Sequence, residues 1–241
     1  MADVVSTPVQ EQAPSAGLFT RLVGVVFAPR DAYTAIAAHP KWFGALSVVT
    51  LIMIAGQVIL LSTDVGRNMT LDQQLSVMKS LGVTVTQEMV QQMEARMAYG
   101  PYWTGASLLV SVPLISVAFA GLLLAIFTAI LGGGATFRQV FAVVVHSGII
   151  GAISQTFSLP IMYAREDMSG PTRLAVFFPM LNEMGWANYF FSAIDLFIIW
   201  SLINLSIGVA VLYKRQTGSV ASVLLGIYAV IAVIIATVRA F

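Results

Sequence analysis

The stretch FSAIDLFIIWSLINLSIGVAVLY, residues 191–213, decides the fold class, because it is long and apolar enough to cross a lipid bilayer. It nevertheless carries a carboxylate, Asp195, near its start. Such a group near the centre of a span costs about 2.5–3.5 kcal/mol, and each apolar neighbour returns roughly 0.3–0.6 kcal/mol. The stretch therefore predicts a transmembrane helix with one ionisable residue inside it.

The whole chain has the composition of a membrane protein. Of its 241 residues, 58% are hydrophobic and 10% are charged, and the mean hydropathy is +0.88. Soluble domains carry about 25% charged residues. The net charge of +1 gives no basis for binding nucleic acid. Without cysteine, the chain has no disulfide, thiolate metal site or cysteine nucleophile.

Five runs reach the ~20 apolar residues that a crossing requires. The predicted spans are residues 42–61, 104–131, 140–163, 189–213 and 220–238. Short connections make the second and third spans antiparallel neighbours, and likewise the fourth and fifth. Pro113 predicts a tilt or kink in the second span. We expect an all-α, polytopic bundle of five transmembrane helices, with residues 42–241 as the membrane domain.

Two segments precede the first span. Residues 1–16 are polar and contain proline, which predicts a disordered tail and not a signal peptide. Residues 17–41 predict an amphipathic segment at the membrane interface. Its apolar residues at helical spacing are Phe19, Leu22, Val23, Val26 and Phe27. A core helix packed under the bundle fits the same pattern.

The loop of residues 62–103 predicts a helical hairpin outside the cytoplasm. Thr70 and Gln73 match a capping box for its first helix, and Gly82 would end that helix. Its apolar side is Leu71, Leu75, Met78 and Leu81. The second helix carries methionines at four-residue steps, which are more often a buried face than an adaptable binding surface.

Polar side chains inside the spans predict a seam between the third and fourth helices. Its members are Asp195, Gln155, Ser158, His146, Asn204 and Ser201. Because these two helices run antiparallel, Gln155 and Ser158 match Asp195 in depth, and His146 matches Asn204. Small and hydroxyl residues let membrane helices approach and bond to one another. We interpret Asp195 as a structural strut, since no second acid and no lysine lies within a span.

The same residues give little basis for catalysis. His146 invites a metal or proton-shuttle interpretation, but His39 lies on another element, and no acid stands at ligand spacing beside either. A structural imidazole is the favoured interpretation. The glycine-rich turn before Phe137 lacks the residues of a phosphate loop. The sequence predicts no catalytic residue, no metal site and no cofactor.

Three motifs follow one another along the chain: a Phe-x-Pro-Arg entry, a glycine-rich turn before a phenylalanine, and an Asp-Leu-Phe-x-x-Trp block. Their residues are Phe27, Pro29, Arg30, Phe137, Asp195, Leu196, Phe197 and Trp200. In this order and spacing, from residue 17 to the end, the chain resembles the Yip domain family (Ypt/Rab-interacting proteins), particularly its bacterial branch. The resemblance implies five spans with the first loop longest.

The orientation depends on this resemblance, because the predicted loops place six Lys and Arg residues on each side of the membrane. The family implies a cytoplasmic N-terminus, so the C-terminus is expected outside. We expect an integral multi-pass protein of a bacterial inner membrane.

Eukaryotic members of the resembled family act as non-enzymatic membrane adaptors for small GTPases and vesicle proteins. GTPase binding is not carried over, because this chain has only a short tail where those relatives carry a longer cytosolic segment. We predict a non-enzymatic adaptor or assembly subunit. Its expected partners are the lipid bilayer and an unidentified membrane or peripheral protein, with a homo-oligomer left open. The alternative is a small-molecule or lipid transporter using Asp195, Gln155 and His146; a membrane enzyme comes third.

Overall fold

The computed structural model describes residues 17–182 and 184–240, and the predicted tail at residues 1–16 lies outside them. Five of the described helices are long and apolar enough to cross a membrane. They are α3 (Phe43–Leu61), α6 (Gly100–Leu131), α7 (Phe137–Arg165), α9 (Leu196–Tyr213) and α10 (Thr217–Ala240). The predicted all-α, polytopic membrane class is confirmed.

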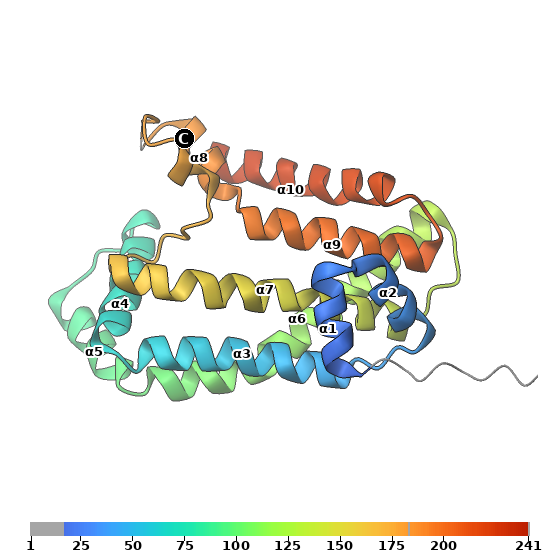
Figure 1. The fold of residues 1–241 in the computed structure, drawn as a ribbon. Coiled ribbons are helices and arrows are strands. Elements are labelled where there is room, and N and C mark those ends of the chain that lie inside the picture. Colours follow the sequence, from blue (N-terminus) through green and yellow to red (C-terminus); the bar gives the residue numbers. More distant parts are fainter. Residues whose placement is uncertain (1–16, 183, 241) are drawn as a thin grey trace, which may run out of the picture.

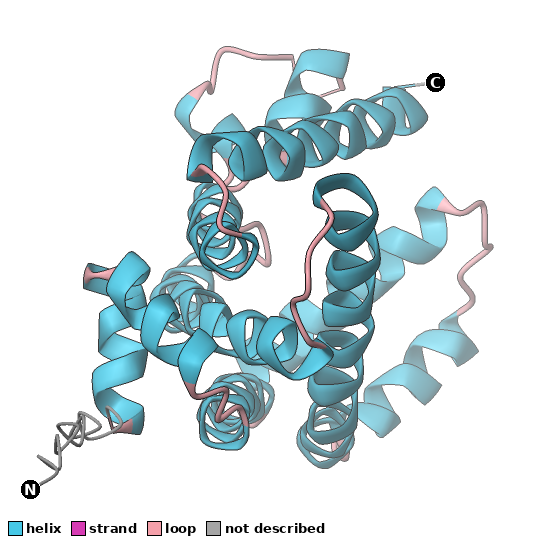
Figure 2. Cartoon of the chain, turned by 90° about the vertical axis from the view of Figure 1, so that its right-hand side faces the viewer, coloured by secondary structure: helices cyan, strands magenta, loops and turns pink. Residues whose placement is uncertain are grey.

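The long helices lie side by side with their axes roughly aligned, and α6 runs obliquely behind them (Figure 1). With 32 residues at about 1.5 Å each, α6 is roughly 48 Å long, more than the ~30 Å hydrocarbon layer. Seen from one end, several long helices stand nearly end-on (Figure 2). Helix α7 contacts α3, α6 and α9, and the first half of α7 supplies much of the buried core.

Two short helices, α1 (Leu18–Phe27) and α2 (Pro29–Ala38), lie at the end of the bundle that we call the N-terminal end (Figure 1). Pro29 separates them, because it stands at the first position of α2 and has no N–H to continue α1. Leu22 and Val25 of α1 are buried in the core. Phe19 and Phe27 on the same helix are exposed, so α1 has one packed and one open face.

The opposite end of the bundle, called here the far end, carries α4 (Asp64–Ser80) and α5 (Gln87–Met97) (Figure 1). The capping box predicted at Thr70 is wrong. Helix α4 begins at Asp64, and the Thr63 hydroxyl accepts a hydrogen bond from the Gly66 N–H. Thr63 can cap the helix because its backbone is extended, as an N-cap requires, directly after α3. Thr70 lies inside α4, where its hydroxyl donates to the Gly66 carbonyl.

The end of α4 and its apolar side agree only in part with the expectation. Gly82 has a φ of 75°, in the left-handed region that glycine adopts readily, and the helix stops just before it. Leu71 is buried, but Leu81 is largely exposed. The first half of α4 therefore packs against the bundle and the second half projects from it.

The continuous fourth span predicted at residues 189–213 is wrong. The chain forms α8 (Trp186–Ala193), leaves helical geometry at Ile194, and starts α9 at Leu196. The reason is a short antiparallel pairing with the loop after α7. The Leu174 N–H donates to Ile194 O at 2.8 Å, and the Leu196 N–H donates to Thr172 O at 3.1 Å. These bonds replace the helical bonds that would have joined α8 to α9.

Candidate functional site

At the N-terminal end, where α1 and α2 meet α9, two deeply buried polar side chains link the three helices. Tyr33 of α2 is fully buried, and its hydroxyl donates a hydrogen bond to Asn204 Oδ1 of α9. The Asn204 Nδ2 group donates in turn to the Val25 carbonyl of α1 at 2.6 Å. One amide thus joins both short helices to a membrane span. We call the group Val25, Tyr33, Asn204 and Gly208 the N-terminal joint.

The sequence explains why Val25 needs this partner. In an uninterrupted helix its carbonyl would accept the N–H of the residue four positions on, which is Pro29 and has none. An unpaired buried carbonyl costs about 1–3 kcal/mol. Asn204 supplies the missing donor from another helix, so the break between α1 and α2 becomes the place where they attach to the bundle.

Gly208 completes the joint one turn further along α9. A Cβ atom at this position would lie 2.5 Å from Val143 Cγ1 and 3.1 Å from the Tyr33 ring. The first distance is far below ordinary van der Waals contact. The missing side chain therefore allows α2, α7 and α9 to converge with the Tyr33 ring lying flush against α9.

Burial raises the pKa of the Tyr33 phenol well above its ordinary value of 10.0, and the nearby Ser147 side chain opposes this effect. The hydroxyl therefore stays protonated at every physiological pH and remains a donor. This protonation state is the one that the acceptor, Asn204 Oδ1, requires.

His146 does not join Asn204 as the seam predicted. Its ring is fully buried in α7, and Nδ1 lies 2.7 Å from the Ala142 carbonyl, to which it donates. Its Nε2 atom has no hydrogen-bond partner among the described residues. Within those residues there is also no group of three acid, histidine or cysteine side chains placed to hold a metal ion. The interpretation of His146 as a structural imidazole stays a prediction.

Asp195 occupies a different place from the predicted interhelical strut. It is the N-cap of α9: its Oδ1 atom accepts the N–H groups of Phe197 at 2.8 Å and Ile198 at 3.3 Å. Its Oδ2 atom accepts the Thr172 hydroxyl at 2.7 Å. These donors meet the carboxylate at a helix start, where a negative charge is favourable. The correction follows from the helix break, which places Asp195 before the span and not inside it.

Gln155 has a separate role as well. Its Nε2 group donates to the Met53 carbonyl of α3 at 2.9 Å, and Gly56 of α3 leaves room for it. Ser158 and Ser201 are half-buried and make no side-chain hydrogen bond within the described residues. The single predicted seam is therefore corrected to three separate features: the N-terminal joint, the α3–α7 bond of Gln155 and the cap of Asp195.

The motif residues mark the structural transitions of the chain. Pro29 opens α2 between the exposed Phe27 and Arg30. Phe137 opens α7 and stacks on Phe141 with ring centroids 5.7 Å apart. In the third motif, Leu196 opens α9 after its cap, and the Phe197 ring lies 5.8 Å from that of Trp200.

Sequence reasoning missed Tyr33, the central side chain of the N-terminal joint. Its partner Asn204 is 171 positions away, so no local pattern links them. The spacing of Val25 and Pro29 could have indicated a partner, because a proline four positions later leaves the Val25 carbonyl without a helical donor.

Comparison with known proteins identifies a family for most of the chain. The family model described as Yip1 domain matches residues 23–239, from α1 to the end of α10. Neither the search of curated proteins nor the search of solved structures returned a match. The matched region includes the N-terminal joint, all five membrane spans and the Asp195 cap. The chain is therefore a membrane protein that belongs to the Yip1 domain family.

Proposed function

We propose that the protein is a non-enzymatic adaptor or assembly subunit that binds another membrane or membrane-associated protein through α1. The observation that carries this proposal is the difference between the two faces of α1. The N-terminal joint and the buried Leu22 fix one face to the bundle. Phe19 is 79% and Phe27 82% exposed on the other. Large exposed aromatic residues on a fixed support are typical of binding surfaces.

The arrangement of the polar groups favours this function over transport. The three residues of the transporter alternative lie in three different places. Asp195 is at the start of α9, Gln155 of α7 donates to the Met53 carbonyl of α3, and His146 is buried in the first half of α7. Asp195 and Gln155 are each hydrogen-bonded within the chain. A substrate pathway requires such groups to converge on one cavity.

The proposal extends to location. The bacterial inner membrane, with the N-terminal end in the cytoplasm and the C-terminus outside, is the setting that the family resemblance favours. The two termini of the described chain do lie at opposite ends of the bundle (Figure 1). A reporter enzyme that is active only outside the cytoplasm should work when fused after Ala240 and fail when fused after Arg215. Activity after Arg215 would overturn this orientation.

The adaptor proposal is tested with a photo-crosslinking amino acid at residue 27, in cells that express the full chain. We expect a covalent adduct with a protein. Adducts with lipid alone would contradict the proposal. The matched control places the same group at residue 102, because Tyr102 is a similarly exposed aromatic residue at the far end.

A second arm uses substitutions and purification in mild detergent. Phe19→Ala with Phe27→Ala should lose the protein that crosslinks at residue 27. Tyr102→Ala with Trp103→Ala should keep it. All four side chains are exposed, so neither double variant should change the thermal unfolding temperature. Equal retention of the partner by both variants would exclude α1 as the binding surface.

A further inference from the structure

A second feature of the N-terminal end is a basic pocket of about 500 Å³ between α2 and the turn that joins α9 to α10. Its cationic lining residues are Arg30, Lys214 and Arg215, and Ala210 and Val211 contribute an apolar wall. In Figure 1 this turn lies beside α2. The described lining residues include no acid. Within the described chain, neither Arg30 nor Lys214 forms an ion pair with an acid.

We propose that this pocket binds the phosphate headgroup of an anionic membrane lipid. The pocket lies where one span ends at Tyr213 and the next begins at Thr217, which is the boundary between hydrocarbon and headgroups. Basic pockets between membrane helices bind anionic headgroups there. The apolar wall would accept the first carbons of the lipid, so the pocket suits a phospholipid better than a free phosphate ion.

The geometry of Lys214 supports a role for its charge. Lys214 has a φ of 52°, in the left-handed region where glycine is favoured over residues with a Cβ atom. The turn itself is a common helix ending: the Arg215 N–H donates to Ala210 O at 2.9 Å. A glycine would make the same turn with less strain, and the lysine adds a cation at the pocket.

The distribution of charge over the described molecule agrees with an anionic partner at this end. Among the described residues, the N-terminal end has six cations and one acid, Asp31. The far end has, within the same residues, six cations and seven acids, which are Asp64, Asp72, Glu88, Glu94, Glu166, Asp167 and Asp195. The acids, and not the cations, therefore make the two ends different. Anionic lipid attracts basic residues near its surface and repels acids.

This inference does not depend on the adaptor function, because the aromatic face of α1 and the basic pocket consist of different residues. The test uses the purified full-length protein with an equimolar mixture of dioleoyl phosphatidylglycerol and dioleoyl phosphatidylcholine. Native mass spectrometry then measures which lipid stays bound. We expect phosphatidylglycerol to be retained in preference to phosphatidylcholine. Equal retention by the wild-type protein would overturn the proposal.

Two pairs of substitutions test whether the lipid binds at this pocket. Arg30→Gln with Lys214→Gln should weaken phosphatidylglycerol binding about fivefold for each cation removed. The matched control, Lys79→Gln with Arg96→Gln, removes the same charge from exposed positions at the far end and should leave binding unchanged. Equal weakening by both pairs would show attraction by net charge alone and would overturn the pocket.

Two further experiments test whether a loss of binding comes from misfolding and whether the ligand is a lipid or a soluble phosphate ester. Lys214→Gly keeps the left-handed turn, so the variant should fold at least as well as the wild type and still bind phosphatidylglycerol about fivefold more weakly. Unchanged binding in this variant would contradict the proposal. Glycerol 1-phosphate at millimolar concentration should not displace the lipid. Complete displacement would identify a soluble phosphate ester as the ligand and overturn the lipid assignment.

Discussion

The two ends of the bundle hold their short helices in different ways. At the N-terminal end, α1 and α2 are joined to the spans by side chains from distant parts of the chain. Asn204 reaches Val25 across 179 positions, and the Gln139 side chain donates to Ala37 O at 3.1 Å. At the far end, α4 and α5 are capped locally by Thr63 and Thr86, and α5 has no buried residue.

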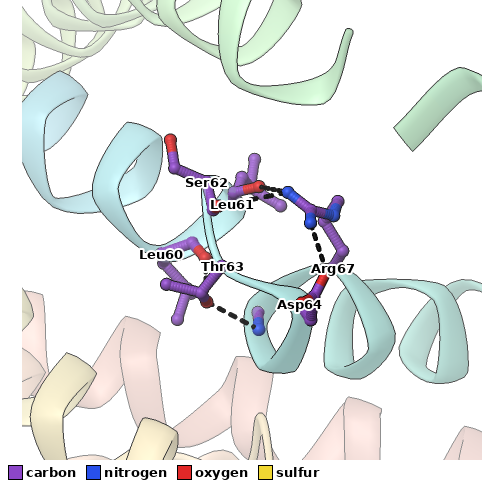
Figure 3. A network of polar contacts seen from close by, with 7 residues as sticks. Leu60, Leu61, Ser62, Thr63, Asp64 and Arg67 are labelled. Carbon is purple, nitrogen blue, oxygen red and sulfur yellow. Dashed lines mark hydrogen bonds and ion pairs between the residues drawn. The ribbon is translucent and has the colours of Figure 1, made fainter. Parts of the chain in front are cut away.

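The junction between α3 and α4 shows the local character of the far end (Figure 3). The Arg67 guanidinium donates to the carbonyls of Leu61 at 3.2 Å and Ser62 at 3.1 Å, and it pairs with Asp64. Each partner lies within six positions of Arg67. Such bonds shape a turn but do not attach α5 to the bundle. The far end should therefore open in local fluctuations, whereas the N-terminal end should unfold with the bundle.

The largest difference between the ends is expected for Asn204→Ala. This change leaves the Tyr33 hydroxyl and the Val25 carbonyl buried without partners, which should lower the free energy of unfolding by about 2–4 kcal/mol. The control is Gln92→Ala, which removes an exposed amide from α5 and should cost less than about 0.5 kcal/mol. Thermal unfolding in detergent measures both. Similar values would remove the distinction between the two ends.

Gly208→Ala should follow, with a loss of about 1–3 kcal/mol. The added methyl group would overlap Val143 and push the Tyr33 ring away from α9. Gly121→Ala is the matched control, because the new Cβ at that position meets no atom within 4 Å. It should be neutral or stabilise the protein by up to about 1 kcal/mol. A neutral Gly208→Ala variant would show that the three helices do not need their close approach.

Tyr33→Phe should cost about 1–2 kcal/mol at neutral pH, because Asn204 loses its donor. The pH dependence of this stability difference gives a second test. Since burial raises the Tyr33 pKa, the stabilisation is complete below pH 10 and is lost as the pH rises above it. The difference in stability between wild type and Tyr33→Phe should therefore shrink above pH 10. A constant difference would mean that the phenol is not buried.

Substitutions of Asp195 test whether its carboxylate is only a helix cap or also an ionisable functional group. Asn is as good an N-cap as Asp, so Asp195→Asn should change stability by only a few tenths of a kcal/mol. Asp195→Ala removes the cap and should cost about 0.5–2 kcal/mol. Unfolding in detergent measures both, and a growth-complementation assay measures function. A stable Asp195→Asn protein that fails in cells would contradict the purely structural role.

A small effect is also expected for Arg67→Gln at the far end. In its ion pair with Asp64, the aspartate side chain is 90% exposed and the arginine side chain 30%, and pairs near the surface contribute about 0–1 kcal/mol. Global stability should stay close to that of the wild type, while hydrogen exchange at the start of α4 becomes faster. A loss above about 2 kcal/mol would show that this turn supports the whole bundle.

Much of the fold could be predicted because hydropathy over about 20 residues reports membrane spans directly. The break at Ile194 could not, since residues 189–194 are as apolar as the span that follows and the competing pairing comes from the loop near Thr172. A local signal for the correct start did exist. Asp195 directly precedes an apolar run, the usual arrangement of an N-cap.

The site was harder to predict than the spans. Depth matching paired His146 with Asn204 because it compared only the two neighbouring spans. That comparison left out α2, which precedes the first span in the chain. Helix α2 packs against α9 and places the Tyr33 hydroxyl beside Asn204. The broader reason is that amphipathic spacing in residues 17–41 fits both a surface helix and a core helix. In the structure one face of α1 packs against the bundle and the other is exposed, and the pattern contains no information on which face packs.

Hydrogen–deuterium exchange of the protein in nanodiscs tests whether α1 and α2 are an integral part of the bundle. Backbone amides in α2 should be protected as strongly as those in α7, while those in α5 should exchange rapidly. In Asn204→Ala, protection of α2 should fall by at least tenfold, with α5 unchanged. Rapid exchange of α2 in the wild type, at the rate of α5, would show that the short helices are not held by the bundle.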